Sequence, residues 1–314
     1  MSTATAVSLF GLDPATYQPH ALHGTDRSYP ETNCYTDVIV ELLHARGDEP
    51  LAAMGTVMRL DFEGDQWTFF KPAPGDLELL YGVDIHEMQP YRSLPGQVAE
   101  QIAAGRTIIV ELDAWYLPDA AATSYHAEHV KTSVAVEAID IAGERMRYFH
   151  GPGYFELEGE DFRGIFDLAV LPPYTEIVRF DAGPPAADLR AASLDSLRVH
   201  LERRPASNPF QAFAAQLSRE LPELLAGDAQ AYHDYAFATV RMLGSAFEAG
   251  ADYADWLLAE RGAPASAAMR RIVETSKVLS FRLARRREFD PEPYLADMAG
   301  AWDEAMAALD GAAA

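Results

Sequence analysis

The sequence predicts an α+β domain followed by an all-α domain, and a change of pattern near Gly183 is the main reason. Up to about residue 180, short runs rich in β-branched and aromatic residues alternate with turn residues. From there to the end, Ala, Leu, Glu and Arg recur at helical spacing. The stretch DAGPPAADLR (181–190) separates the two patterns with two prolines. We therefore place an α+β domain at residues 1–182 and a helical domain at residues 183–314.

Composition limits the class of protein. The chain has 314 residues, of which 49% are hydrophobic and 23% charged, as expected for roughly two globular domains. Its 25 basic and 48 acidic residues give a formal net charge of −23, which disfavours nucleic acid and anionic membranes as partners. One cysteine cannot form an internal disulfide, and no run approaches ~18 apolar residues. The first 20 residues lack the features of a signal peptide, so we expect a cytoplasmic protein.

Six runs predict strands in the first domain. The turn AGER, between Ile141 and Met146, predicts a hairpin between the fourth and fifth of them. The runs are TVMRLDF (56–62), DQWTFFK (65–71), RTIIVELDAWYL (106–117), VKTSVAVEAIDI (130–141), RMRYFHGPGYFEL (145–157) and EIVRFD (176–181).

The sequence of the second domain predicts about five helices. Pro, Gly and Asp interrupt the helical pattern at four places, which mark the expected helix ends. These breaks are RRPASNPF (203–210), LAGDA (225–229), RGAPAS (261–266) and FDPEP (289–293).

The single cysteine, Cys34, lies in RSYPETNCYTDVIVELLHARG (27–47), where a loop becomes a helix. Asn33 or Thr32 can cap this helix, and Gly47 can end it. Its apolar stripe is Val38, Ile39, Leu42, Leu43 and Ala45. The first turn of a helix favours a thiolate over a thiol and offers N–H groups to an oxyanion. A lone cysteine is more often a small buried apolar side chain, so a catalytic role requires a base.

Two histidines stand where such a base and its orienting partner are expected. His129 immediately precedes a long predicted strand, and His150 ends the next one. A helix-borne thiol, a histidine at the head of a strand and a third group on the neighbouring strand form the layout of cysteine peptidases.

The order of these features resembles a known family. The chain contains YPETNCYTDVIVELLHARGDEPLAAMG, DFEGDQWTFFKP, IAAGRTIIVELDAWYLP and YHAEHVKTSVAVEAIDIAGERMRYFH, in that order. Over roughly residues 25 to 170 this is similar to the papain-like N-terminal domain of the butirosin-biosynthesis protein H type, and more closely to a related group of uncharacterised bacterial proteins. The resemblance implies a papain-like fold with Cys34 as nucleophile and His129 as base. The third place, an Asp or Asn in that group, falls here on His150, and Asp140 is the nearest carboxylate in sequence.

The resemblance also implies a reaction. Butirosin H-type proteins move an aminoacyl group from a carrier-protein thioester to an amine, so we expect an acyl-Cys34 intermediate and no cofactor on this chain. The donor would sit on the phosphopantetheine of an acidic acyl carrier protein, and the acceptor would be a small amine. Asn33 is the candidate oxyanion donor. Candidates for binding the aminoacyl ammonium are Asp65, Trp67, Asp113 and Tyr125, although a turn carboxylate and a core aromatic are the simpler readings of Asp65 and Trp67.

A metal site is the weaker reading of the histidine pairs His20/His23 and His126/His129, because no second ligand motif accompanies them.

The helical domain carries a basic strip. Between Met269 and Phe289, one helix face collects six cations, with Phe281 among them. Such a strip either pairs with acidic neighbours of the same chain or docks an acidic partner such as a carrier protein. The six are Arg270, Arg271, Lys277, Arg282, Arg285 and Arg286.

The reading that follows is a thiol-dependent acyltransferase. Two alternatives stay open at this point: a cysteine amidase or thioesterase, and a catalytically inactive module that binds carrier proteins.

Overall fold

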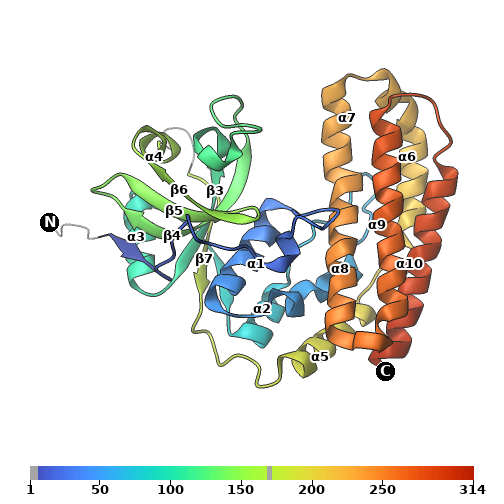
Figure 1. Cartoon of the computed structure of the whole chain (residues 1–314), viewed down its shortest axis with the longest axis horizontal. Helices are drawn as coiled ribbons and strands as arrows, with labels where there is room; N and C mark the ends of the chain where they lie inside the picture. The colour runs from blue at the N-terminus through green and yellow to red at the C-terminus, as the bar shows by residue number, and fades with distance from the viewer. Residues whose placement is uncertain (1–5, 168–171) are drawn as a thin grey trace. The chain divides into compact units, whose positions relative to one another are not determined.

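The computed structural model describes residues 6–167 and 172–314, which form two compact units (Figure 1). The sheet unit contains Met1–Gly24, Asn33–Pro50 and Pro74–Ala186. The helical unit contains Thr25–Thr32, Leu51–Ala73 and Ala187–Ala314. A single division at Gly183 assigns Thr25–Thr32 and Leu51–Ala73 to the first domain, whereas the structure groups both with the helices.

An antiparallel sheet is the centre of the sheet unit, and the predicted α+β character is confirmed. Strand order is β2-β7-β3-β4-β5-β6, with β1 added to β4, and every pairing is antiparallel. The predicted hairpin is the pair β4–β5. The strands are β1 (Val7–Ser8), β2 (Asp84–Met88), β3 (Thr107–Asp113), β4 (Lys131–Asp140), β5 (Arg145–His150), β6 (Gly153–Glu158) and β7 (Thr175–Arg179).

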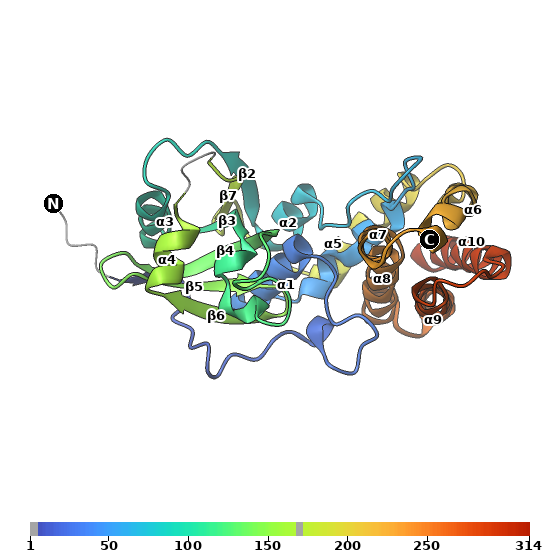
Figure 2. The same cartoon turned by 90° about the horizontal axis from the view of Figure 1, so that it is seen from above.

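Helices cover both faces of this sheet. Helix α1 packs on β4 and β5, whereas α3 packs on β3 and β4 from the other side (Figure 2). Side chains alternate between the faces, so Val110, Val134 and Tyr148 lie in the apolar core with α3. The helices are α1 (Cys34–Arg46), α2 (Pro74–Tyr81), α3 (Leu94–Ala103) and α4 (Glu160–Ile165), with short 3₁₀ turns η1 (Ala21–His23), η3 (Ala114–Tyr116) and η4 (Pro118–Ala120).

Two of the predicted strands are wrong. Residues 50–59 form the 3₁₀ helix η2 (Pro50–Arg59), and the only pairing shown between 56–62 and 65–71 in the described chain is an isolated bridge between Phe62 and Trp67. The reason is burial on all sides: Val57 and Met58 are successive residues and both are buried. A Cβ on Gly250 of α8 would lie 2.8 Å from the Val57 side chain. Packing against helices therefore overrides the β propensity of this stretch.

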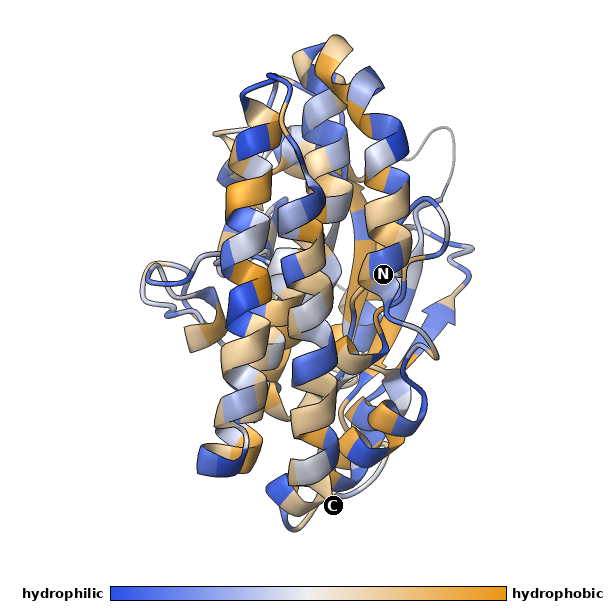
Figure 3. Cartoon of the chain, turned by 90° about the vertical axis from the view of Figure 1, so that its right-hand side faces the viewer, coloured by the Kyte–Doolittle hydropathy of each residue, from blue (hydrophilic) through white to orange (hydrophobic). Residues whose placement is uncertain are grey.

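The helical unit contains six α-helices in the described residues, where the sequence predicts about five. Hydrophilic and hydrophobic residues alternate around them, as expected for helices with one buried face (Figure 3). A short π-helix, η5, lies between α7 and α8. The elements are α5 (Leu189–Glu202), α6 (Pro209–Ala226), α7 (Ala229–Ala236), η5 (Phe237–Arg241), α8 (Met242–Leu258), η6 (Ala259–Arg261), α9 (Ala263–Ala284) and α10 (Glu292–Ala313). None of the helices in the described residues could span a membrane.

A buried ionic cluster fixes α1 to the chain that precedes it. His23 lies 3.3 Å from Asp37 and hydrogen-bonds Glu41, which also accepts the Tyr17 hydroxyl. The side chains of His23, Asp37 and Glu41 are almost fully buried. Burial alone disfavours the imidazolium, but the hydrogen bonds and charges of Asp37 and Glu41 outweigh it and raise the pKa of His23 to about 9. His20 and His23 thus serve packing and ion pairing, and no metal-binding set of three His, Cys, Asp or Glu occurs among the described residues.

This raised pKa predicts a pH-dependent stability. Because the folded pKa exceeds the unfolded value of about 6.5, the contribution of His23 is complete below that pH and is lost as the pH rises through about 9. We expect the free energy of unfolding to fall by about 3 kcal/mol across that range. NMR titration of the His23 ring and urea unfolding measure the two effects. The control variant His86→Gln should show the same fall, and a His23 ring that loses its proton below pH ~7 would contradict the prediction.

Candidate functional site

Helix α1 begins at Cys34, as predicted. Asn33 is its N-cap: the backbone there is extended and its side-chain oxygen accepts the Thr36 N–H at 2.9 Å. Gly47 ends the helix with a φ of 91°, a left-handed conformation that favours glycine. Cys34 is half-buried and its thiol is free. The side-chain oxygen of Asn33 is therefore used for capping, and the role of its NH2 group as an oxyanion donor stays a prediction.

His129 is held on two sides at the point where β3 and β4 end their pairing. Its Nδ1 lies 2.6 Å from Oδ2 of Asp113, the last residue of β3. The other Asp113 oxygen accepts the Trp115 N–H at 3.0 Å. The Trp115 ring stacks on the imidazole, with centroids 4.5 Å apart and planes 12° apart. Asp113 fixes the ring tautomer while Trp115 fixes its plane, although the His129 side chain is 68% exposed.

A second histidine–carboxylate pair extends this arrangement. His126 Nε2 lies 2.9 Å from Asp161, and its ring stacks on Tyr125 at 4.1 Å. The Tyr125 hydroxyl donates to the same carboxylate at 2.8 Å, and this hydrogen bond raises the pKa of Tyr125. His126 has a φ of 50°, unusual for a residue with a side chain. Trp115 also contacts His126, with centroids 5.8 Å apart, so the four rings form one ladder in which the two histidines are exposed and Trp115 and Tyr125 are half-buried.

His150 does not orient His129. Its Nδ1 lies 2.5 Å from Asp119 and its Nε2 lies 2.8 Å from the Thr132 hydroxyl, so both ring nitrogens are engaged. Thr132 and Lys131 are successive residues of β4 and point to opposite faces of the sheet. Lys131 stands opposite Asp113 in the β3–β4 register, so the two side chains share a face. His150, which bonds to Thr132, therefore lies on the face opposite the Asp113–His129 pair. In place of the predicted hydrogen bond between the two histidines, His129 donates to Asp113.

The start of α1 contacts the same face of the sheet that carries Asp113. The hydroxyl of Tyr35, the residue after Cys34, donates to Glu176 of β7 at 2.7 Å. Burial, together with the Glu176 hydrogen bond and charge, raises the pKa of Tyr35 well above its usual range. Glu176 is in register with Ile109 of β3, four residues before Asp113. The start of α1 and His129 therefore belong to one face of one sheet.

Among the residues that the structure describes, no hydrogen bond joins Cys34 Sγ to His129, and Nε2 of His129 forms no hydrogen bond with a side chain or backbone group. The Cys34–His129 dyad accordingly stays a prediction, with Asp113 as its orienting carboxylate.

The four predicted substrate-binding residues fall in two units. Asp113 and Tyr125 belong to the sheet unit, where each is engaged as described above. Asp65 and Trp67 belong to the helical unit. Trp67 is buried against Phe62, Phe210 and Phe213, so its ring is a core aromatic, and Asp65 is exposed in a bend.

Two family models cover most of the chain. The DUF1839 N-terminal domain matches residues 18–180, and the DUF1839 C-terminal domain matches residues 186–311. The chain belongs to the DUF1839 family. A comparison with curated proteins gives no match. Every residue of the Cys34, Asp113 and His129 arrangement lies within the part matched by the DUF1839 N-terminal domain.

The DUF1839 C-terminal domain contains the basic strip, which divides into two parts. Arg270 pairs with Asp252 and Asp255 of α8, whereas Arg271 pairs with Asp297 and Glu304 of α10. Lys277 pairs with Glu274 on its own helix. The other three cations of the strip, Arg282, Arg285 and Arg286, make no ion pair with any residue in 6–167 or 172–314. Three of the six are thus neutralised within the chain.

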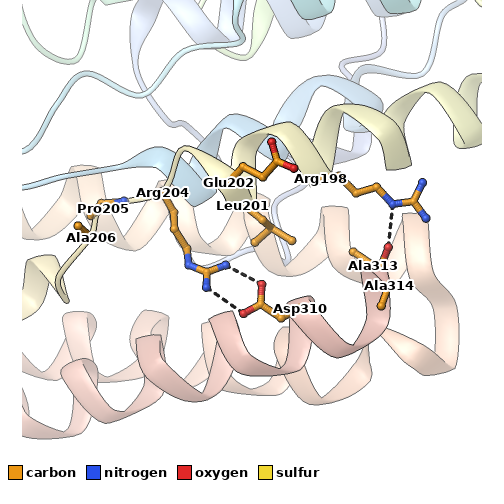
Figure 4. A pocket seen from close by; sticks show the side chains of 9 residues that line it. All are labelled: Arg198, Leu201, Glu202, Arg204, Pro205, Ala206, Asp310, Ala313 and Ala314. Carbon is orange, nitrogen blue, oxygen red and sulfur yellow. Dashed lines mark hydrogen bonds and ion pairs between the residues drawn. The ribbon is translucent and has the colours of Figure 1, made fainter.

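The same DUF1839 C-terminal domain has an open cavity of about 700 Å³ between α5 and α10 (Figure 4). Arg204 forms two hydrogen bonds with Asp310, at 2.6 and 2.9 Å, and Arg198 donates to the Ala313 carbonyl at 2.8 Å. Its arginines are therefore already satisfied, and its lining includes none of the residues predicted for the site.

Asp113 is predicted from the sequence to bind substrate, and the structure shows in addition a hydrogen bond between Asp113 and His129. Asp113 ends β3, and β3 pairs with the strand that follows His129. This position is the sequence signal that could have identified the contact. Trp115 and Asp161 were missed, because only the fold brings them to the histidines.

The Asp113 contact predicts a tautomer. In the native protein, neutral His129 should carry its proton on Nδ1, and Asp113→Ala should shift that proton toward Nε2, because no carboxylate then accepts it. Ring ¹⁵N chemical shifts of His129 report this directly. The matched variant His150→Ala should leave the His129 tautomer unchanged. If His150→Ala changes it and Asp113→Ala does not, the assignment of the orienting residue is reversed.

Proposed function

We propose that this DUF1839 protein is a cysteine-dependent acyltransferase that uses Cys34 as nucleophile and His129 as base. The observation that carries the proposal is the clamp on His129. Asp113 accepts from Nδ1 and Trp115 supports the ring, so Nε2 is left to take a proton. Cys34 opens a capped helix on the same face of the sheet, where the helix N-terminus favours a thiolate.

The reaction follows from these roles. The Cys34 thiolate attacks the carbonyl carbon of a thioester, and the carbon–sulfur bond of the donor breaks. The departing thiolate takes the proton that His129 received from Cys34 and leaves as a thiol. An amine then attacks the acyl-Cys34 carbonyl, His129 accepts the amine proton, and the Cys34 thiolate is released. No oxidant or cofactor is required at any step.

The resemblance to butirosin H-type papain-like domains supports this choice of reaction. In that group the donor is an aminoacyl thioester on a carrier protein, so we propose an acidic acyl carrier protein and a small amine as the two substrates here. The partly exposed ladder of Trp115, His126 and Tyr125 adjoins the base and suits a cationic aminoacyl group, because aromatic faces attract cations. Asp113 replaces the Asp or Asn that those domains carry on the following strand.

One observation favours a second candidate. The Cys34 thiol forms no hydrogen bond with His129 within the described chain, which is the arrangement expected of an inactive module that only binds carrier proteins. A hydrolase differs less, since water would replace the amine at the same acyl-Cys34 intermediate.

A small aminoacyl thioester tests the proposal. Incubation with alanyl-N-acetylcysteamine should produce an alanyl adduct on Cys34, detected by mass spectrometry, and Cys34→Ala should abolish it. His129→Ala should slow adduct formation by ~100-fold or more, the contribution typical of a positioned base.

The partition of the adduct separates the alternatives. Addition of a primary amine should yield an amide for a transferase, whereas a hydrolase releases alanine at the same rate with or without it. If the folded protein acquires an adduct no faster than the urea-unfolded chain, the inactive module is the correct reading.

A further inference from the structure

The segment Arg27–Thr32 lies along α8. Arg27 pairs with Asp252, and the Ser28 and Tyr29 N–H groups donate to the Glu248 carboxylate at 2.9 and 2.8 Å. Arg241 donates to the Thr32 carbonyl at 3.2 Å. Residues 252, 248 and 241 lie four and seven apart, so they share one side of the helix. The segment therefore follows a single stripe of the helical unit, and Thr32 precedes Cys34 by two residues in the sequence.

Glycine lets this segment approach closely. A Cβ on Gly244, between Glu248 and Arg241, would lie 2.6 Å from the Tyr29 ring. The Tyr29 hydroxyl lies 3.0 Å from the Ser276 hydroxyl of α9. Residues 27–32 therefore cover this stripe of α8 and reach α9 as far as Arg241.

Beyond Arg241, exposed aromatic side chains follow the covered stripe. The next position of the stripe is Phe237, the first residue of the π-helix η5, and its side chain is 61% exposed. Phe281 of α9 is 56% exposed and lies eleven residues from Arg270, about three turns, hence on the same side of α9. Arg270 pairs with Asp252, the residue that also holds Arg27. Both phenylalanines therefore lie on the side of the bundle along which the segment runs.

The charge of this region is opposite to that of the chain. The guanidinium of Arg241 lies 5.2 Å from the Phe237 centroid, and that of Arg285 lies 4.5 Å from the Phe281 centroid. Arg282, Arg285, Arg286 and Arg287 are exposed and make no ion pair with any described residue. Since the chain has 48 acidic and 25 basic residues, four neighbouring arginines without a carboxylate partner are unexpected.

We propose that the docking patch, formed by Phe237, Phe281, Arg282, Arg285 and Arg287, binds an acidic partner protein through carboxylates placed around an apolar side chain. Exposed aromatic residues ringed by arginines are the composition of binding hot spots. A net charge of −23 would repel an acidic partner elsewhere, so the patch also selects where it binds. The identification of that partner as the acyl carrier protein rests on the proposed function, whereas the patch and its acidic ligand do not.

The test uses a defined acidic probe. A fluorescent helical peptide built only from Glu and Leu, with the leucines on one face, is titrated into the full-length chain and followed by anisotropy at low salt. Arg282→Glu combined with Arg285→Glu should weaken its binding at least about tenfold, and added salt should weaken binding to the native chain. Phe237→Ser combined with Phe281→Ser should also weaken it, because both rings are exposed and their loss leaves the core intact.

Matched controls decide the outcome. Arg59→Glu combined with Arg219→Glu makes the same change of net charge at exposed sites of the helical unit and should leave binding unchanged. Equal losses in the two arginine pairs, or no binding by the native chain, would overturn the docking patch. The measurement uses no thioester, so failure of Cys34 acylation would remove the proposed function without affecting this result.

Discussion

Three aspartates determine the shape of the loop between β3 and β4, and the candidate site depends on that loop. Asp113 holds His129, Asp119 holds His150, and Asp161 holds His126. Each histidine donates through one ring nitrogen to a carboxylate, which is the contact that fixes an imidazole in one tautomer. The loop also forms backbone hydrogen bonds of its own, among them His126 N–H to the Trp115 carbonyl at 3.0 Å, and the side-chain bonds add the orientation of the three rings to that backbone frame.

The three pairs do different work, although their chemistry is the same. Asp119 accepts from both His150 and the Tyr148 hydroxyl, on the core side of the sheet, so this pair anchors the loop. Asp161 accepts from His126 and Tyr125 and maintains a residue with positive φ. Among the described residues, both His126 and His129 keep an exposed ring with one nitrogen unengaged, but only His129 is paired with an aspartate on the α1 face of the sheet. Anchoring by the first two pairs lets the third be exposed without losing its geometry.

The sequence could predict what depends on neighbouring residues. The helix that starts at Cys34, its caps at Asn33 and Gly47, and the β4–β5 hairpin all follow from local patterns. The orienting residue could not be predicted, because His150 ends β5 on one face of the sheet whereas His129 lies on the other. A one-residue difference in strand register moves a side chain to the opposite face. The strands predicted at 56–62 and 65–71 are wrong for another reason, since successive residues such as Val57 and Met58 are both buried and Val57 packs against α8, far along the sequence.

The interleaving of the two units gives the segment before Cys34 its importance. Arg27–Thr32 is counted with the helices, and Asn33 onward with the sheet, so the chain changes unit one residue before the thiol. Arg241 holds Thr32 on the helical side, and Asn33 caps α1 on the other. Arg241 also pairs with Glu31 and lies over Phe237, the first ring of the docking patch. One guanidinium thus fixes Glu31 and Thr32 to the helical unit and orients an exposed aromatic ring beside them, so the residues just before α1 obtain their order from α8 and η5 rather than from the sheet.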